Sequence, residues 1–417
     1  MSNKVSGAVT GKQAQKDGLV PKLRFPEFRG ALGWELWPLK KLAKRRTRKN
    51  AGAKVDRVLT NSAEHGVVDQ RDYFEKDIAN PANLERYFII EKGDYVYNPR
   101  VSSLAPVGPI HKNEIGLGVM SPLYTVFAFD STENDFYAHY FKTTHWHSYL
   151  RQVSNSGARH DRMAISADDF INMPVPVSHP VEQQKIADCL SSIDALIAAE
   201  ADKLEALKAH KRGLMRQLFP APGETIPRLR FPEFQSAEDW NIQPLESLCM
   251  VLNNRRKPIA SSLRQPGPYP YYGASGVVDY VDDYIFDESL ILVGEDGAKW
   301  GAFERTAFIA DGRYWVNNHA HVLRPEGAIG TFLTNYLVML DFQPFVTGKA
   351  PPKLTLGKLK AIPIPIPPTS AEQSKIGSAL STMDAMIDAQ ASRMEELTKH
   401  KRGLMQQLFL VAGEVSA

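Results

Sequence analysis

Residues 181–219 read VEQQKIADCLSSIDALIAAEADKLEALKAHKRGLMRQLF, and residues 371–409 repeat them as AEQSKIGSALSTMDAMIDAQASRMEELTKHKRGLMQQLF. The two stretches are identical at about 22 of 39 aligned positions, which indicates an internal duplication. In each copy apolar residues recur at alternating steps of four and three, which is the seam of a coiled coil. A helix of this length, about 58 Å, has to bury its seam. The pattern therefore predicts two long helices packed as an antiparallel coiled coil.

Two seam positions in each helix are polar: Glu200 and Lys211 in the first, Gln390 and Lys401 in the second. Polar seam residues cost stability and often fix the register of a coiled coil. If the helices pair antiparallel end to end, Glu200 lies opposite Gln390, whose amide can form a hydrogen bond to it. The alternative is that each helix packs only on its own domain.

The helix starts carry their own signals. Pro180 suits the first position of the first helix, and Ser370 with Gln373 predicts a capping box for the second. Alternating prolines at 173–177 and 362–368 exclude a helix and a central strand. These proline-rich segments are therefore expected to be semi-rigid tethers between domain and helix.

A second repeat opens each half: residues 21–28 read PKLRFPEF and residues 227–234 read PRLRFPEF. Between the shared segments, residues 40–173 and 246–362 show little resemblance. Either a tandem duplication drifted, or a common frame carries two separately chosen domains. Near-identical helices beside dissimilar domains favour the second interpretation.

The dissimilar segments are predicted to be mixed α+β domains. Aromatic and β-branched residues between turn residues predict short strands at 87–90, 95–97, 124–129, 280–286, 290–293 and 321–323. A helix is expected at 136–151 and another at 329–342. The predicted fold class is α+β: two mixed α+β domains joined by two long helices in an antiparallel coiled coil, with a pseudo-twofold internal repeat.

The expected organisation follows from these patterns: a disordered polar extension 1–20, a first domain 21–177, a spacer helix 178–222, a second domain 223–366, a second spacer helix 367–410 and a tail 411–417. The composition, with 43% hydrophobic and 23% charged residues, is that of a globular protein. No apolar run approaches a membrane span, and no secretory signal is expected. The two cysteines, Cys189 and Cys249, exclude a disulfide framework or a cysteine-based zinc site and suggest a cytoplasmic location.

Basic residues cluster at corresponding places in the two domains, although the net charge is only +3. Arginine and lysine contact phosphates, and arginine also recognises guanine. The alternative to DNA binding is that these residues form an ordinary solvent-exposed basic surface. The predicted DNA-binding residues are Lys44, Arg45, Arg46, Arg48, Lys49, Arg100, Arg159, Arg162, Arg255, Arg256, Lys257, Lys299, Lys349 and Lys353.

Catalytic motifs are missing from the sequence. It contains no phosphate-binding loop, no dinucleotide fingerprint, no nucleophile elbow and no HExxH pair. The tetrapeptide typical of adenine methyltransferases is also absent. Glu295 and Lys299 are a nuclease-like hint with the wrong spacing, and the pair His145 and His147 is expected to point to different faces. No catalytic residue and no metal site is predicted.

The combination of motifs resembles the specificity subunit of type I restriction-modification systems. The resemblance rests on LRFPEF followed by tryptophan (residues 23–34 and 229–240), EQxKI (182–186 and 372–376) and HKRGLM (210–215 and 400–405). Residues 269–276 and 295–298 are similar to a common target-recognition pattern, and 65–68 and 121–124 to another. The resemblance covers about residues 21–409.

The resemblance implies that each domain is a target-recognition domain for one half of a bipartite, asymmetric site in double-stranded DNA. It implies that the helix pair sets the spacing between the half-sites. Two methyltransferase subunits would dock on the chain and methylate adenine N6, and restriction subunits would translocate and cut. S-adenosylmethionine, ATP and Mg²⁺ would bind to those partners, with no cofactor on this chain. Two other classes remain open: an enzyme, and a coiled-coil adaptor that ignores DNA.

Overall fold

The computed structural model describes residues 19–73, 81–154, 161–348 and 351–410. Residues 1–18 of the predicted extension, the tail 411–417, Arg159 and Lys349 lie outside the described residues. The chain divides into two compact units: unit 1 is Met1–Ala198 with Glu395–Ala417, and unit 2 is Ala199–Met394. Each unit therefore takes in a part of both long helices, and the predicted domain limits remain a prediction.

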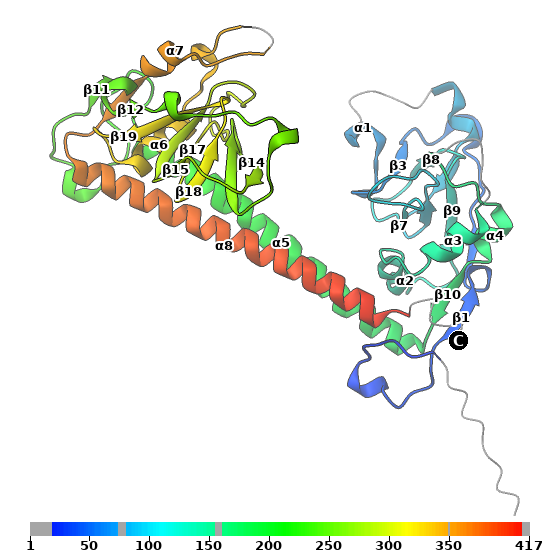
Figure 1. Ribbon diagram of the computed structural model, residues 1–417. Coiled ribbons are helices and arrows are strands. Elements are labelled where there is room, and N and C mark those ends of the chain that lie inside the picture. The colour runs from blue at the N-terminus through cyan, green and yellow to red at the C-terminus, as the bar shows by residue number, and fades with distance from the viewer. Residues whose placement is uncertain (1–18, 74–80, 155–160, 349–350, 411–417) are drawn as a thin grey trace, which may run out of the picture. The chain divides into compact units, whose positions relative to one another are not determined.

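Unit 1 is built on an antiparallel sheet of order β2-β9-β6-β7: Ala43–Arg45, Thr125–Phe129, Tyr95–Tyr97 and Ile110–Lys112 (Figure 1). Three two-stranded antiparallel sheets accompany it: β1-β10 (Glu35–Pro38, Pro174–Val177), β3-β4 (Leu59–Ser62, Gly66–Asp69) and β5-β8 (Phe88–Ile90, Gly118–Met120). The short helices are α1 (Gln70–Tyr73), α2 (Asp135–Tyr140), α3 (His147–Val153) and α4 (Ala167–Ile171). Buried aromatic rings dominate the core; Tyr95, for example, stacks on Phe127.

Unit 2 has a corresponding antiparallel sheet of order β12-β19-β16-β17: Cys249–Val251, Ala320–Pro325, Leu290–Gly294 and Ala307–Ala310. A second sheet has the order β14-β13-β18-β15: Gly276–Val281, Tyr269–Gly273, Arg313–Val316 and Phe286–Asp287. A two-stranded sheet pairs β11 with β20 (Asn241–Pro244, Pro363–Ile366), and the helices are α6 (Gly330–Met339) and α7 (Leu356–Lys360). The dissimilar sequences thus share the order of one four-stranded sheet and also a two-stranded antiparallel sheet (β1-β10 and β11-β20), while the remaining strands are arranged differently.

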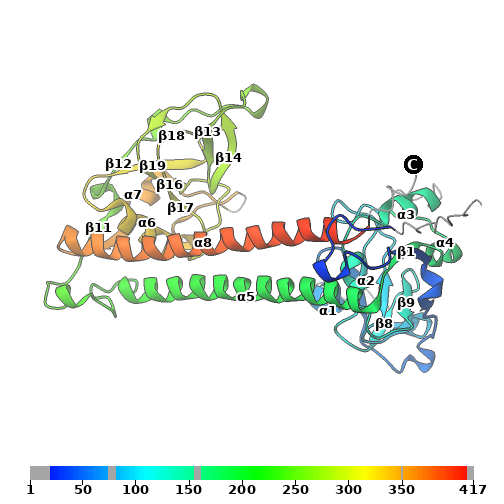
Figure 2. The same ribbon diagram turned by 90° about the horizontal axis from the view of Figure 1, so that it is seen from below.

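The predicted long helices are α5 (Pro180–Leu218) and α8 (Ser370–Leu408), and in each unit they run antiparallel beside one another (Figure 2). In unit 2, Nε2 of Gln390 donates to Oε2 of Glu200 at 2.6 Å, which is the contact that the antiparallel register predicts. Lys211 Nζ lies 2.5 Å from Asp384 Oδ1. In unit 1 the equivalent pair joins Lys401 to Asp194. The polar seam positions therefore all have partners across the seam.

The repeated LRFPEF segment links the two helices within each unit. In unit 1 the buried Arg24 forms a bidentate pair with Glu182 of α5, with Nε–Oε1 2.7 Å and Nη2–Oε2 2.8 Å, and Leu23 N donates to the carbonyl of Gln407 in α8. In unit 2 Arg230 pairs with Glu372 of α8 in the same way. The repeated segment thus holds the start of one helix by a buried ion pair and, in unit 1, the end of the other by a backbone hydrogen bond.

The proline-rich segments are paired strands, which corrects the expectation of semi-rigid tethers. β10 pairs with β1 (Trp37 opposite Val175), and β20 pairs with β11 (Gln243 opposite Ile364). Prolines at alternate positions leave the N–H groups of the valines and isoleucines for one partner strand. A two-stranded sheet needs no donor on the other edge, so the prolines are tolerated there.

Two further expectations about helices are wrong. The helix expected at 136–151 is two helices, α2 and α3, and in the break between them the hydroxyl of Thr143 donates to the carbonyl of Tyr140 at 2.7 Å. The capping box of Ser370 and Gln373 does not form. Thr369 accepts the N–H of Glu372 instead, and the Gln373 side chain accepts the N–H of Ile329 at the start of α6.

Candidate nucleic-acid interface

Each unit contains an equivalent corner, at which the end of a central strand meets a segment from near the end of the same domain. In unit 1 residues Arg100, just after β6, and Arg162 form an isolated antiparallel bridge. In unit 2 Asp296, just after β16, and Lys353 form the same bridge. Because β6 and β16 hold the same place in their sheets, the corners are equivalent in topology. Predicted DNA-binding residues therefore come together at matching places although the local sequences differ.

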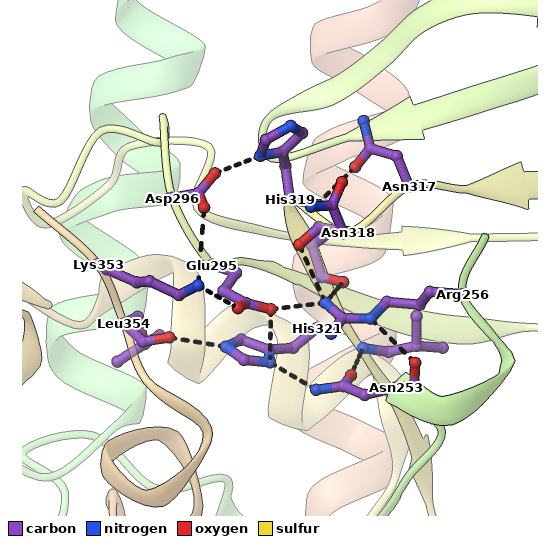
Figure 3. A network of polar contacts seen from close by, with 12 residues as sticks. Asn253, Arg256, Glu295, Asp296, Asn317, Asn318, His319, His321, Lys353 and Leu354 are labelled. Atoms are coloured by element: carbon purple, nitrogen blue, oxygen red, sulfur yellow. Dashed lines mark hydrogen bonds and ion pairs between the residues drawn. The ribbon is translucent and has the colours of Figure 1, made fainter. Parts of the chain in front are cut away.

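In unit 2 this corner is a polar network centred on Glu295 (Figure 3). Its side chain is 12% exposed and accepts from Arg256 at 2.6 Å (Nη1–Oε2) and from Lys353 at 2.8 Å (Nζ–Oε1). Nδ1 of the buried His321 lies 3.6 Å from Oε2 of the same carboxylate. The Glu295 carboxylate thus contacts three residues that are distant in the sequence: Arg256, His321 and Lys353.

The electrostatics of the network follow from burial and pairing. Burial alone would raise the pKa of Glu295, but the hydrogen bonds from Lys353 and Arg256 outweigh it and hold that pKa below the usual range. Burial lowers the pKa of His321, so its ring is neutral near pH 7. Its Nδ1 lies 2.8 Å from the Asn253 amide nitrogen and its Nε2 2.8 Å from the Leu354 carbonyl, so Nε2 carries the proton.

In unit 1 the corresponding corner opens into a cavity of about 480 Å³. Its polar lining includes Asn98, Arg100, Tyr124 and Arg162. Asp161 lies 3.9 Å from Nη2 of Arg100 and 3.7 Å from Nε of Arg162. The corner of unit 1 therefore has arginines around an open cavity, whereas the corner of unit 2 is closed by a network around one carboxylate. The two corners differ in the chemistry that they offer to a ligand.

The basic run of unit 1 starts on the edge strand β2 and continues beyond it. Lys44 pairs with Asp130 at 3.0 Å, Arg46 with Asp94 at 3.4 Å and Arg48 with Glu91 at 3.4 Å. Arg45 and Lys49 are exposed, and neither has a side-chain ion pair among the described residues. The run is therefore partly neutralised, with Arg45 and Lys49 left for an anionic ligand.

The basic residues of unit 2 fall into two groups. Arg255 bonds Glu288 at 2.8 Å and lies over the Phe286 ring, and Arg256 is 14% exposed and bound to Glu295, so both are already paired with a carboxylate. Lys257 is exposed and has no ion-pair partner among the described residues. Lys299, exposed and 3.7 Å from Glu304, takes no part in the Glu295 network.

Sequence reasoning missed the turn Asn317–His319, between β18 and β19, which lies over the Glu295 network. Arg256 Nη1 donates to the carbonyls of Ala320 at 2.8 Å and Asn318 at 3.3 Å, and Glu295 N donates to the carbonyl of His319 at 2.8 Å. The only local signal was two adjacent asparagines, which are common in turns. The contact with Glu295 depends on a fold that brings residues 24 positions apart together.

Two other features of the described part bear on ligands. No helix there combines the length and the apolar character that a bilayer crossing needs. No three side chains of His, Cys, Asp or Glu in residues 19–73, 81–154, 161–348 and 351–410 are grouped to hold a metal ion.

The comparisons with known proteins agree on one family. Residues 237–399 match the family described as type I restriction modification DNA specificity domain. A putative type I restriction enzyme specificity subunit of Haemophilus influenzae is 40% identical over 153 residues, 36% of this chain and 38% of that protein. A putative type I restriction enzyme specificity subunit of Methanocaldococcus jannaschii is 22% identical over 271 residues, 61% of this chain and 62% of that protein. The chain thus covers less than two thirds of the length of both relatives.

Solved structures extend the likeness to the whole fold. The crystal structure of the S subunit of a type I system from M. genitalium aligns with a TM-score of 0.59 at 15% identity, over 94% of this chain and 99% of that one. A chain from a study of complex assembly and conformational transition in the type I system aligns with a TM-score of 0.54 at 16% identity, over 91% of this chain and 98% of that one. The resemblance seen in the repeated motifs is therefore confirmed: residues 237–399 match the DNA specificity domain of type I restriction-modification systems, and the chain has the fold of the solved specificity subunit.

Proposed function

We propose that this chain is the non-catalytic DNA-recognition subunit of a type I restriction-modification complex, in which each unit recognises one half of a bipartite, asymmetric site. The observation that carries the proposal is the shared corner: equal topology in the two units, filled with different polar side chains. Such a design suits two half-sites of different sequence, because base recognition depends on the particular donors and acceptors presented.

The helix pair has the properties of a spacer. α5 and α8 are each a 39-residue helix, about 58 Å long, and polar contacts fix their register. At about 3.4 Å per base pair this length corresponds to one to two turns of duplex. We propose that the pair sets the unread gap between the half-sites.

The partners in this proposal are two methyltransferase subunits and the restriction subunits, which would carry S-adenosylmethionine, ATP and Mg²⁺. Assembly is supported by the relative whose structure was determined in a study of type I complex assembly. The two LRFPEF segments, one in each unit, are nearly identical in sequence, as the docking of two copies of one partner would require. Methylation of adenine N6 on opposite strands would follow, with each base extruded from the duplex.

The test is a base-by-base map of N6-methyladenine in the genome of cells that carry this chain with its modification subunits, compared with cells lacking this chain only. We expect one split motif, methylated once on each strand, that vanishes with the chain. An unchanged map would contradict the proposal. Purified chain that binds no DNA at about 50 mM salt, where phosphate contacts are strongest, would instead support an adaptor.

A further inference from the structure

The turn Asn317–His319 presents side chains from a backbone that is fixed on several sides. The carbonyls of Asn318, His319 and Ala320 all accept hydrogen bonds from the Glu295–Arg256 pair. The N–H of His319 donates to Oδ1 of Asn317 at 2.8 Å, and the N–H of Asn317 donates to the carbonyl of Tyr272 at 3.1 Å. The backbone of the turn is thus fixed by the Glu295–Arg256 pair on one side and by Tyr272 of the strand β13 on the other.

The three side chains of the turn have different roles. Asn317 is buried, and its amide oxygen is used by the turn itself. His319 is half exposed, and its Nδ1 is held by the carboxylate of Asp296. Asn318 is exposed, and its amide has no hydrogen-bond partner among the residues that the structure describes. One amide, with both its donor and its acceptor available, therefore stands on a fixed turn.

The surroundings of Asn318 suit an anionic polymer. Lys257 lies beside the strand that leads into the turn: its N–H donates to the carbonyl of Val316 at 3.3 Å, and its own carbonyl accepts from the Trp315 indole at 2.6 Å. The Lys257 side chain is exposed without an ion-pair partner in the described part of the chain. A phosphate contact from this lysine would position the duplex, while the amide would face the bases.

We propose that Asn318 determines the specificity of unit 2 at one base pair and recognises adenine there. An asparagine amide forms a bidentate pair with adenine, accepting from N6 and donating to N7 in the major groove. Because the turn is already fixed, little conformational entropy is lost when the pair forms. This inference rests on the proposed function and assigns a residue and a base to it.

The equivalent turn of unit 1 supports this division of roles. Residues 121–124 lead into β9 as residues 317–319 lead into β19, and they present the exposed apolar Leu123, 60% accessible, in place of an amide. An apolar side chain cannot form the bidentate pair, so Leu123 cannot recognise adenine in this way. The two turns thus differ as the recognition of two unlike half-sites requires.

The test uses the full chain with its modification subunits and the N6-methyladenine map as the readout. With Asn318→Ala we expect one adenine of one half-site to lose its specificity, with discrimination reduced about tenfold or more and the other half-site unchanged. With Asn318→Asp we expect the same position to favour cytosine, whose N4 donates to a carboxylate. Asn241→Ala is the control, because Asn241 is also exposed but lies on β11, away from the turn.

Each result has one meaning. An unchanged motif with Asn318→Ala, or methylation weakened equally at every sequence, overturns the assignment and leaves the proposed function intact. No split motif with the unaltered chain rejects the proposed function itself. Because the Asn318 side chain is exposed, thermal unfolding of both variants should match that of the unaltered chain, which separates lost recognition from lost folding.

Discussion

At the level of single residues, Glu295 pairs with two cations in unit 2, Arg256 and Lys353. Replacing it with Gln removes the negative charge while Arg256, 14% exposed, keeps its positive charge. A buried cation that loses its partner costs about 3 kcal/mol, so we expect Glu295→Gln to destabilise unit 2 by about that amount. Hydrogen exchange of β16 and β19 would measure the loss within the unit. Glu246→Gln is the matched control: Glu246 is exposed, its partner Lys360 is 3.7 Å away, and the cost should stay below about 1 kcal/mol.

The same residue predicts a pH dependence. The pKa of Glu295 is lower in the folded state than the unfolded value of about 4.3, so its stabilisation is present above that value and lost as the pH falls through the folded pKa. The pKa of His321 is also lowered, by burial, so protonation below about pH 6.5 destabilises the fold in the same direction. We expect unit 2 to lose stability from pH 7 to pH 4. With Glu295→Gln the part of this loss below about pH 5 should shrink; an unaltered slope would contradict the assignment.

Ion pairing decides which basic residues remain for a phosphate, and it could not be predicted from the sequence. Arg45 and Arg256 belong to similar basic runs, yet of the two only Arg256 meets a buried carboxylate, that of Glu295, 39 residues away just after β16. We expect Arg45→Ala to weaken DNA binding equally for all sequences and to lower the salt slope by about one. A titration from 50 to 200 mM salt would measure this. Arg228→Ala, an exposed arginine near the second LRFPEF segment, should leave the slope unchanged; a loss at one base only would contradict a phosphate contact at Arg45.

At the scale of the element, the seam of α5 and α8 depends on pairs that repeat between the units. Lys211 is 15% exposed and bonds Asp384 across the seam, as Lys401 bonds Asp194. A double-mutant cycle of Lys211→Met and Asp384→Asn should give a coupling of about 1 kcal/mol, because partial burial strengthens the pair. Unfolding of unit 2 by urea would measure each member of the cycle. The exposed pair of Lys208 and Glu205 on the same helix is the control and should couple by no more than about 0.5 kcal/mol. Equal couplings would show that the seam pair gains nothing from its position.

These helices could be predicted from the sequence because their seam is a local pattern repeated over 39 residues. β10 and β20 could not, since alternating prolines are compatible with a strand only if a single partner lies on the correct edge. The strand order of the central sheets could not be predicted either. β6 pairs with β9, and β16 with β19, across long stretches of sequence, and no local pattern shows which strands pair.

At the scale of the whole molecule, the duplication could be predicted from the sequence, but the equivalence of the two corners could not. Arg100 and Asp296 have opposite charges, so a sequence alignment would not place them at equivalent positions. The bridges to Arg162 and Lys353 show that they occupy the same place. If the proposed function holds, a fold that keeps this backbone pairing while its side chains change would allow a new specificity, which would explain why sequence likeness is kept in the helices and lost in the domains.

The proposed spacer role leads to the last prediction. Seven residues inserted beside Glu200, and seven on the facing side of Gln390, add one heptad to both helices, or about 10 Å, and keep the seam in phase. If the helices set the gap, the methylated motif should keep both half-sites and gain about three base pairs between them. A heptad in α5 alone is the control: it displaces Glu200 from Gln390 and should abolish methylation. An unchanged gap with the paired insertion would show that the separation of the half-sites is set elsewhere, because nothing else in that variant is altered along the helices.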